Sequence, residues 1–310
     1  MDKIEHIYEE FIEYKSTRII ECKTCGFKHV YPIPSREQIE EFYRKEYYNS
    51  TFHFDYSVVN EEYINKKLEE IESYTHYRET YEKVCSFKQT PYKNMLDIGC
   101  GNELLVRFFQ NRGWSVWALE PSRNASEYLR KFSIPTFNIT VEQIENLLSE
   151  EVTNLSFVNI QFVFEHLRDP HQLLRDVYHR MVPGGIIRIC VPNDFSEGQR
   201  AYWEYYNEQP YWVQLPDHIN YFNFRTLRST LLTNGFEEVY CTTIFPLEFL
   251  LLGGINYYGN PDDAKKVGPF VNNFEQAFIR TGRKHILEKL YESLAQAEFG
   301  RSIIMYAIKK

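Results

Sequence analysis

One stretch of the chain, from Asn94 to Ser122 (NMLDIGCGNELLVRFFQNRGWSVWALEPS), limits the fold more than any other. It begins with an apolar run typical of a buried strand, turns at Gly99-Cys100-Gly101, and continues with apolar residues at helical spacing. A second apolar run then ends at the acidic residue Glu120. This order predicts a nucleoside site, because the glycines admit a ligand to the backbone and the acid can accept both ribose hydroxyls.

Two residues indicate which nucleoside the loop would bind. The dinucleotide fingerprint requires a third glycine three residues after the second, and Leu104 occupies that position. Asp97 stands just before the loop, where its charge would repel a pyrophosphate but suit a cationic ligand. S-adenosylmethionine, which carries an ammonium and a sulfonium and no phosphate, fits both observations.

The segments LDIGCG and ALEPS resemble the first two motifs of the class I S-adenosylmethionine-dependent methyltransferases. The resemblance covers residues 92–244 well, the N-terminal segment in part and residues 246–300 hardly at all. It implies that the tip of the fourth strand lies along the methionine part of the cofactor. The cofactor-binding residues that it implies are Asp97, Gly99, Cys100, Gly101, Glu120, Gln161 and Phe162.

The pair Glu165-His166, which follows the fourth strand, is similar to part of the metal site of some methyltransferases. The first acid of that metal motif would fall at Phe162 and is therefore missing. We expect no catalytic metal here, and interpret both residues as hydrogen-bonding groups that orient the start of the next helix.

Strands and helices alternate through the middle of the chain, which predicts right-handed crossovers and a doubly wound parallel sheet. The expected fold class is α/β, a Rossmann-like, seven-stranded, mostly parallel sheet with a helical N-terminal cap and a helical C-terminal insertion. Ligands of such sheets bind at the carboxyl ends of the strands. The expected strands are 95–98, 114–119, 134–139, 155–162, the wholly apolar 186–191, 237–244 and 302–308.

The predicted organisation has four parts. Residues 1–90 form a mainly helical cap that begins with an amphipathic helix, because Ile4, Ile7, Tyr8, Phe11 and Ile12 make one apolar stripe. Residues 91–245 form the cofactor-binding core, and residues 301–310 supply its final strand. Residues 246–300 form a helical insertion whose apolar stripes are packing faces. In the family the cap often contacts the cofactor, for which Tyr47, Tyr48 and Arg78 are candidates.

Cys22-Lys23-Thr24-Cys25-Gly26 has the form of a zinc knuckle, in which two thiols reach one metal ion. Some sugar and natural-product methyltransferases carry an N-terminal zinc ribbon with two knuckles, and this segment resembles the second half of that module. A closed site requires four ligands, and the only nearby candidates are His29 and His53. There is no second Cys-x-x-Cys pair, so two of the four ligands are unaccounted for, and we expect no stoichiometric zinc.

Composition limits the partners of the chain. Its 35 basic and 43 acidic residues give a net charge of −8, which argues against a general nucleic-acid binder.

The first residues are charged and resemble no signal peptide, and no apolar run is long enough to span a bilayer. Several of the six cysteines fall in predicted buried strands, which fits a reducing cytoplasm. The long apolar stripes of the insertion leave a homodimer open.

These observations predict a methyltransferase that uses S-adenosylmethionine on a small-molecule acceptor, such as a sugar or natural-product intermediate. The ring-rich segment 193–216, with Trp203 and Trp212, suits stacking on such an acceptor. His218, which precedes Tyr221-Phe222 as in the family, is the predicted catalytic base. The alternatives are a protein or RNA methyltransferase, a nucleotide-dependent oxidoreductase, and a non-catalytic protein that kept the nucleoside fold.

Overall fold

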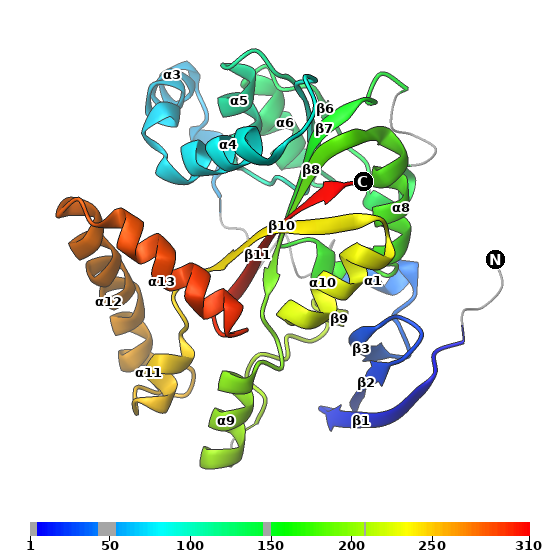
Figure 1. Ribbon diagram of the computed structural model, residues 1–310, viewed down its shortest axis with the longest axis vertical. Coiled ribbons are helices and arrows are strands. Elements are labelled where there is room, and N and C mark those ends of the chain that lie inside the picture. Colours follow the sequence, from blue (N-terminus) through cyan, green and yellow to red (C-terminus); the bar gives the residue numbers. More distant parts are fainter. Residues whose placement is uncertain (1–4, 43–53, 145–149, 208) are drawn as a thin grey trace. The chain divides into compact units, whose positions relative to one another are not determined.

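The computed structural model of the chain describes residues 5–42, 54–144, 150–207 and 209–310 (Figure 1). It contains a seven-stranded sheet in the order β10-β11-β8-β7-β4-β5-β6 and a four-stranded sheet in the order β1-β2-β3-β9. The strands are β1 (Tyr8–Tyr14), β2 (Thr17–Cys22), β3 (Phe27–Tyr31), β4 (Asn94–Ile98), β5 (Ser115–Leu119), β6 (Thr136–Phe137), β7 (Leu155–Gln161), β8 (Met181–Pro192), β9 (Asn220–Tyr221), β10 (Phe236–Thr243) and β11 (Ser302–Lys309).

The large sheet has the predicted Rossmann-like architecture. Strand β4 pairs in parallel with β5 and with β7, and β5 pairs in parallel with β6. Most side chains of β4 and β7 are buried, as expected for strands covered on both faces. The predicted fold class is confirmed, with a third strand, β6, that is shorter than the sequence suggested.

Several helices begin at a residue whose side chain caps the first turn. The side chain of Ser122 accepts a hydrogen bond from the backbone of Ala125 at the start of α6, and Asp169 caps α8 with Pro170 at the first helical position. The helices are α1 (Arg36–Phe42), α3 (Glu61–Glu70), α4 (Thr75–Phe87), α5 (Leu105–Gln110), α6 (Arg123–Lys131), α8 (Pro170–Arg180), α9 (Glu197–Tyr206), α10 (Phe224–Thr233), α11 (Glu248–Leu252), α12 (Pro261–Arg280) and α13 (Lys284–Gln296), with the 3-10 turns η2 (Tyr56–Val58), η3 (Ile71–Ser73), η4 (Val141–Gln143) and η5 (Phe164–His166).

The chain does not open with the predicted amphipathic helix. Residues 8–14 form strand β1, which pairs antiparallel with β2. The turn between them consists of Lys15 and Ser16, both with positive φ, which matches the twist of a two-residue hairpin. The cap is therefore helical only from α1 onward. The prediction failed because the apolar spacing in this segment suits a helix, while pairing with β2 decides its structure.

The ring-rich segment 193–216 is helical in part. Its middle forms α9, which begins with a capping box made by Ser196 and Gln199. Trp212 is fully buried and its ring lies edge-on to Phe195 and Tyr211, so it packs inside the protein and cannot stack on an acceptor.

The insertion is helical, as predicted. Helices α12 and α13 pack around the buried residues Phe245, Leu250, Leu287 and Tyr291. The rings of Phe270 and Phe274 on α12 contact Phe245, so this apolar stripe of the insertion is a packing face, as expected. Among the described residues, no helix is long and apolar enough to cross a membrane.

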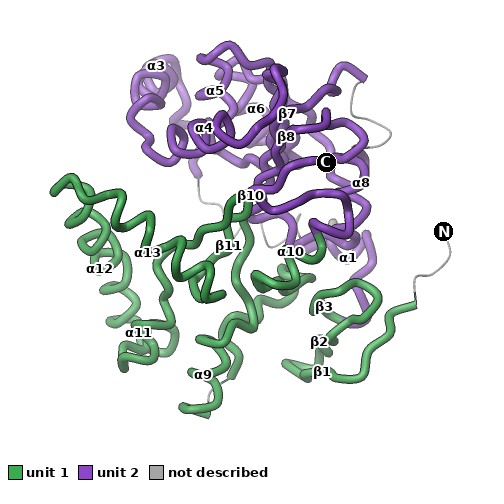
Figure 2. The backbone as a smooth tube through the Cα atoms, in the orientation of Figure 1, with its two compact units in different colours: residues 1–30, 190–230, 240–305 green, residues 31–189, 231–239, 306–310 purple. Residues whose placement is uncertain are grey.

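The described chain divides into two compact units (Figure 2). The first unit comprises residues 1–30, 190–230 and 240–305, and contains the four-stranded sheet and the helical insertion. The second unit comprises residues 31–189, 231–239 and 306–310, and contains the glycine loop with the strands around it.

Candidate functional site

The predicted cofactor residues gather at one edge of the large sheet in the second unit. Strands β7, β4 and β5 are neighbours in that order, and their carboxyl ends carry Gln161, the loop Gly99–Gly101 and Glu120. The parallel register pairs Ile98 with Leu119, so the loop and the acid leave adjacent strands at the same level. Sequence spacing alone predicted this placement, while the binding roles of the residues remain predictions.

The two glycines of the loop serve different purposes. Gly99 has a φ of +70°, and a Cβ atom at this position would lie 2.2 Å from the Cγ2 atom of Val163. Its amide donates to the carbonyl of Leu119 at 2.7 Å, which fixes the start of the loop on β5. Gly101 has a φ of +55°, and a Cβ atom there would meet no atom within 4 Å. Gly99 is therefore required by packing, and Gly101 leaves open space beside the backbone.

The carboxylate of Glu120 binds the backbone of this loop and of the segment that follows β5. One oxygen accepts a hydrogen bond from the amide of Gly101 at 2.8 Å, and the other accepts one from the amide of Ser122 at 2.7 Å. The side chain is buried, and burial raises the pKa of Glu120 while these two hydrogen bonds lower it. Each oxygen keeps a lone pair, so the carboxylate can accept two further hydrogen bonds from ligand hydroxyls.

The backbone of Glu120 is fixed by residues of the elements that follow. Ser126 of α6 donates to its carbonyl oxygen at 2.7 Å, and Asn138 donates to the same oxygen at 2.9 Å. The Asn138 amide also reaches the carbonyl of Pro121 at 2.9 Å. The acid therefore has one defined position, which is what recognition of a pair of hydroxyls requires.

Asp97 belongs to a buried polar chain that crosses three strands. Asn159 of β7 donates to Asp97 Oδ1 at 2.7 Å, and Arg188 of β8 donates to Asn159 Oδ1 at 2.8 Å. Arg188 also donates to Gln161 Oε1 at 2.9 Å, and so orients a second predicted cofactor residue. Burial raises the pKa of Asp97 to about 7, although the Asn159 hydrogen bond and the Arg188 charge lower it.

Sequence reasoning missed both partners of Asp97. The fifth strand was predicted to be wholly apolar, which is wrong because Arg188 lies within it and is 7% exposed. Asn159 is likewise a polar residue inside an apolar run. A charged or amide side chain in the middle of a buried strand was the available signal, since such groups are retained only when they are hydrogen-bonded.

The two remaining predicted residues differ in character. Cys100 is buried, which raises the pKa of its thiol well above the ordinary value and keeps it protonated. Phe162 has a φ of +52° and is 45% exposed at the end of β7. A bulky residue in this backbone region is strained, and such strain gathers at ligand sites. Its ring is available at the edge of the sheet where the loop lies.

The cap contributes residues to the loop that the spacing did not reveal. Tyr77 of α4 contacts the carboxylate of Glu103 and accepts from the amide of Leu104 at 2.9 Å. Tyr56 donates to Asn102 Oδ1 at 2.7 Å, and its pKa is raised first by burial and then by the charge of Glu120. The cap residues that the family resemblance implied are placed differently. Arg78 is exposed and donates to the carbonyl of Glu72, and residues 47 and 48 lie outside the described part of the chain.

His218 lies in the first unit, directly before β9. Its amide donates to the carbonyl of Gln214 at 2.8 Å, and its own carbonyl accepts from the hydroxyl of Tyr221 at 3.2 Å. These bonds fix the backbone of the segment that carries the imidazole. The catalytic role of His218 stays a prediction, as does the orienting role of Glu165 and His166 in η5.

A model of a known protein family matches residues 44–240, more than half of the chain, and that family is described as "Methyltransferase domain". The match includes the glycine loop, Glu120, the tip of β7 and His218.

Curated relatives match a shorter stretch. A ubiquinone biosynthesis O-methyltransferase of Xanthomonas campestris pv. campestris (strain B100) is 26% identical over 106 residues, which are 33% of this chain and 44% of the relative. One of Caulobacter sp. (strain K31) is 28% identical over 111 residues, which are 34% of this chain and 44% of the relative. The chain thus spans less than half the length of the curated relatives it matches.

Solved structures of similar fold include a SAM-dependent methyltransferase from Archaeoglobus fulgidus. It is 19% identical with a TM-score of 0.46, and the alignment covers 76% of this chain and 93% of that one. The magnesium protoporphyrin IX methyltransferase from Synechocystis PCC 6803 is 10% identical with a TM-score of 0.48, over 89% of this chain and all of its own.

The different surroundings of the loop glycines predict different costs of substitution. Gly101→Ala should cost about 1–2 kcal/mol of the free energy of unfolding, because only the positive φ opposes it. Gly99→Ala should cost about 1–3 kcal/mol more, because Val163 must also move. Gly113→Ala is the matched control, since Gly113 has a φ of +75° and no atom within 4 Å of an added Cβ. Urea unfolding measures all three, and equal losses at Gly99 and Gly113 would contradict the packing role of Gly99.

Proposed function

The chain belongs to the methyltransferase-domain family, and on that premise we propose that it transfers a methyl group from S-adenosylmethionine to a small-molecule acceptor. The class predicted from the motifs, an S-adenosylmethionine-dependent methyltransferase, is confirmed by the family match, and the alternative of a nucleotide-dependent oxidoreductase is set aside. The acceptor and the residues that bind the cofactor are the parts that we propose.

The observation that carries the proposed cofactor site is the position of Glu120 against the open loop. Its buried carboxylate faces the Gly101 amide, and open space lies beside Gly101 for a ligand. Glu120 would accept the two ribose hydroxyls, and Asp97 would attract the ammonium group through water or loop amides. Gln161 and the ring of Phe162 would lie along the rest of the cofactor.

The reaction is a direct displacement. The acceptor atom forms a bond to the methyl carbon as the bond from that carbon to the sulfonium breaks, and sulfur retains the electron pair. The acceptor proton leaves to a base or to water. Alignment of the nucleophile with the carbon–sulfur bond supplies most of the acceleration, and a base contributes only where the acceptor must lose its proton.

Charge supports a small acceptor over a nucleic acid. The first unit holds a pocket of about 330 Å³ that is lined by four cations, Lys23, Lys28, Arg200 and Arg225. Each of these cations is paired with a carboxylate, respectively of Glu9, Glu21, Glu197 and Glu298. A nucleic acid needs unpaired positive charge for its phosphates, and the net charge of −8 adds to the repulsion.

The names of the curated relatives support oxygen as the accepting atom, because both are O-methyltransferases.

Ring stacking offers less support for a particular acceptor than the sequence suggested. Trp212 is buried, which leaves the half-buried Trp203 and the exposed Tyr205 and Tyr206 as the available rings of that segment. A sugar and an aromatic acceptor are both compatible with these rings, and a protein acceptor remains the alternative.

Substitution of Glu120 tests the cofactor site. Glu120→Ala should weaken binding of S-adenosylhomocysteine by about 1.5–3 kcal/mol, roughly 10- to 100-fold in Kd, because charged hydrogen bonds to the ribose are lost. Glu127→Ala is the matched control, since Glu127 lies on α6 and pairs with Arg123 at the surface. Calorimetry with NAD as the comparison ligand measures the effect, and an unchanged Kd in Glu120→Ala would remove this residue from the site.

The pKa of Asp97 predicts a pH dependence of cofactor binding. Because this pKa is raised to about 7, the carboxyl is mostly neutral at pH 6 and mostly ionised at pH 8. The ammonium group of the ligand prefers the ionised form of Asp97, so the Kd of S-adenosylhomocysteine should rise as the pH falls from 7.5 to 5.5, by up to about tenfold per unit below the pKa. Asp97→Asn should bind weakly and lose this dependence. A pH profile shared by the wild-type protein and Asp97→Asn would show that another group is responsible.

His218 is the proposed base where the acceptor is a hydroxyl or an amine. His218→Ala should lower turnover by roughly 10²-fold or more and leave the Kd of the cofactor unchanged. His285→Ala, at an exposed position of α13, is the control. Turnover is measured with the methylated acceptor once one is found by screening phenols, sugars and amines. Near-normal turnover of His218→Ala would leave the enzyme working by alignment alone.

A further inference from the structure

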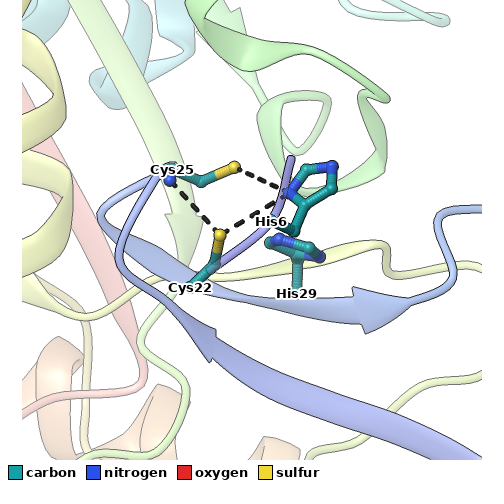
Figure 3. A group of neighbouring side chains, drawn as sticks. All are labelled: His6, Cys22, Cys25 and His29. Carbon is teal, nitrogen blue, oxygen red and sulfur yellow. Dashed lines mark hydrogen bonds between the residues drawn. The ribbon is translucent and has the colours of Figure 1, made fainter. Parts of the chain in front are cut away.

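Four side chains of the first unit converge beside the knuckle that the sequence marked (Figure 3). They are His6, Cys22, Cys25 and His29, and their ligand atoms all lie within 4.8 Å of one another. The expectation that two of four ligands would be missing is therefore wrong. His29 was among the candidates, and the fourth ligand is His6, which the sequence placed in a helix; His53 lies outside the described residues.

The two thiols are presented by a tight turn between β2 and β3. Strand β2 ends at Cys22, and Gly26 adopts a φ of +82° as its amide donates to the carbonyl of Cys22 at 2.9 Å. The amide of Cys25 points at the sulfur of Cys22, 3.4 Å away. The turn therefore holds both cysteines close together, with the sulfur of Cys22 in contact with the backbone of Cys25.

The segment before β1 brings His6 to the same turn. The amide of Lys23 donates to the carbonyl of Ile7 at 2.8 Å, and the Thr24 hydroxyl donates to the carbonyl of Glu5 at 2.9 Å. Thr24 Oγ1 in turn accepts from the amide of Ile7 at 3.2 Å. Three hydrogen bonds thus hold the backbone on both sides of His6 against the knuckle.

His29 offers a nitrogen that no other group uses. The residue is fully buried, and its Nδ1 lies 2.8 Å from the carbonyl of Val30, so Nδ1 carries the proton and donates. The lone pair is then on Nε2, which has no hydrogen-bond partner in the described part of the chain. A ligating histidine typically donates its other nitrogen to a carbonyl in this way, which fixes the tautomer.

The distances fit one ion between the four atoms. Nδ1 of His6 lies 3.5 Å from both sulfurs. A neutral imidazole nitrogen has a single lone pair, so it cannot accept good hydrogen bonds from both thiols. A tetrahedral zinc with bonds of about 2.3 Å to sulfur and 2.0 Å to nitrogen would place these atoms about 3.5 Å apart.

We propose that His6, Cys22, Cys25 and His29 bind one zinc ion in a closed, structural site. Two thiolates and two imidazoles select zinc over the oxygen-seeking magnesium and calcium. Four protein ligands leave no open position, so the ion stabilises the fold and does no chemistry on a substrate. It would tie the segment before β1 to β3, which pairs with β9 at His29 and Asn220 and so supports the segment after His218.

Metal analysis tests the proposal on the full chain, purified without a polyhistidine tag and given one equivalent of zinc before desalting. The wild-type protein should hold about one zinc per chain, and Cys22→Ser and His6→Gln should each hold less than about a fifth of that. Cys85→Ser and His285→Gln, both at exposed positions, are the matched controls and should keep the ion. Absence of zinc from the wild-type protein, or equal zinc in Cys22→Ser and Cys85→Ser, would overturn the site.

Cobalt keeps the test decisive if a variant fails to fold. The wild-type protein, freed of metal and loaded with cobalt, should show the intense visible bands of a tetrahedral ion and a thiolate charge-transfer band, and zinc should bleach both. His6→Gln should weaken the visible bands and keep the thiolate band, because both cysteines remain. A weak octahedral spectrum without a thiolate band in the wild-type protein would rule out this ligand set.

Discussion

The site at the sheet edge depends on a hydrogen-bonded chain buried beneath it. Asp97, Asn159 and Arg188 lie on the adjacent strands β4, β7 and β8, and the parallel register pairs Asp97 directly with Asn159. The guanidinium of Arg188 lies near the ring of Tyr306 on β11, so the polar chain spans four neighbouring strands. Removing any one partner would leave a buried polar group unsatisfied, which costs more than the bond itself contributes. This chain fixes the sheet at the level where the glycine loop begins.

The same hydrogen-bonded chain sets the charge state of Asp97, on which its proposed role beside a cationic ligand depends. An isolated acid in an apolar sheet would stay protonated well above neutral pH. Burial raises the pKa of Asp97, and the Asn159 hydrogen bond and then the charge of Arg188 oppose this effect, so that the pKa is about 7. The two carboxylates at this edge of the sheet have different hydrogen-bond donors. Asp97 accepts from the side chain of Asn159, and Glu120 accepts from two backbone amides.

The central fold was predictable because its signals are local. The glycine loop, the caps Ser122 and Asp169, and the apolar runs of β4, β5 and β7 each specify their own element, and strand alternation then places their ends together. The choice of the proposed cofactor residues followed from that placement. Asn159 and Arg188 were hidden because a strand pattern shows burial but not which polar groups meet across strands.

The N-terminal hairpin was unpredictable for another reason. Its turn is Lys15-Ser16, where the usual signal would be Asn-Gly, and its apolar residues happen to fit a helical stripe. A helix over this segment gives no reason to place His6 beside Cys22, which lies sixteen residues later in the sequence. Long-range pairing, and not the spacing of ligands, brings the fourth side chain of the cluster to the knuckle.

Helix α12 contains a proline near its middle, so the two halves of the helix differ in how firmly they are held. Pro269 lacks the amide that would bond to the carbonyl of Lys265, and Gly268 before it adds backbone freedom. The half after the proline is held by Val271, Phe274 and Phe278 against the buried cluster, while Val267 is the residue of the first half that packs there. The first half should therefore exchange its amide hydrogens by local opening, at a lower free energy than the second half.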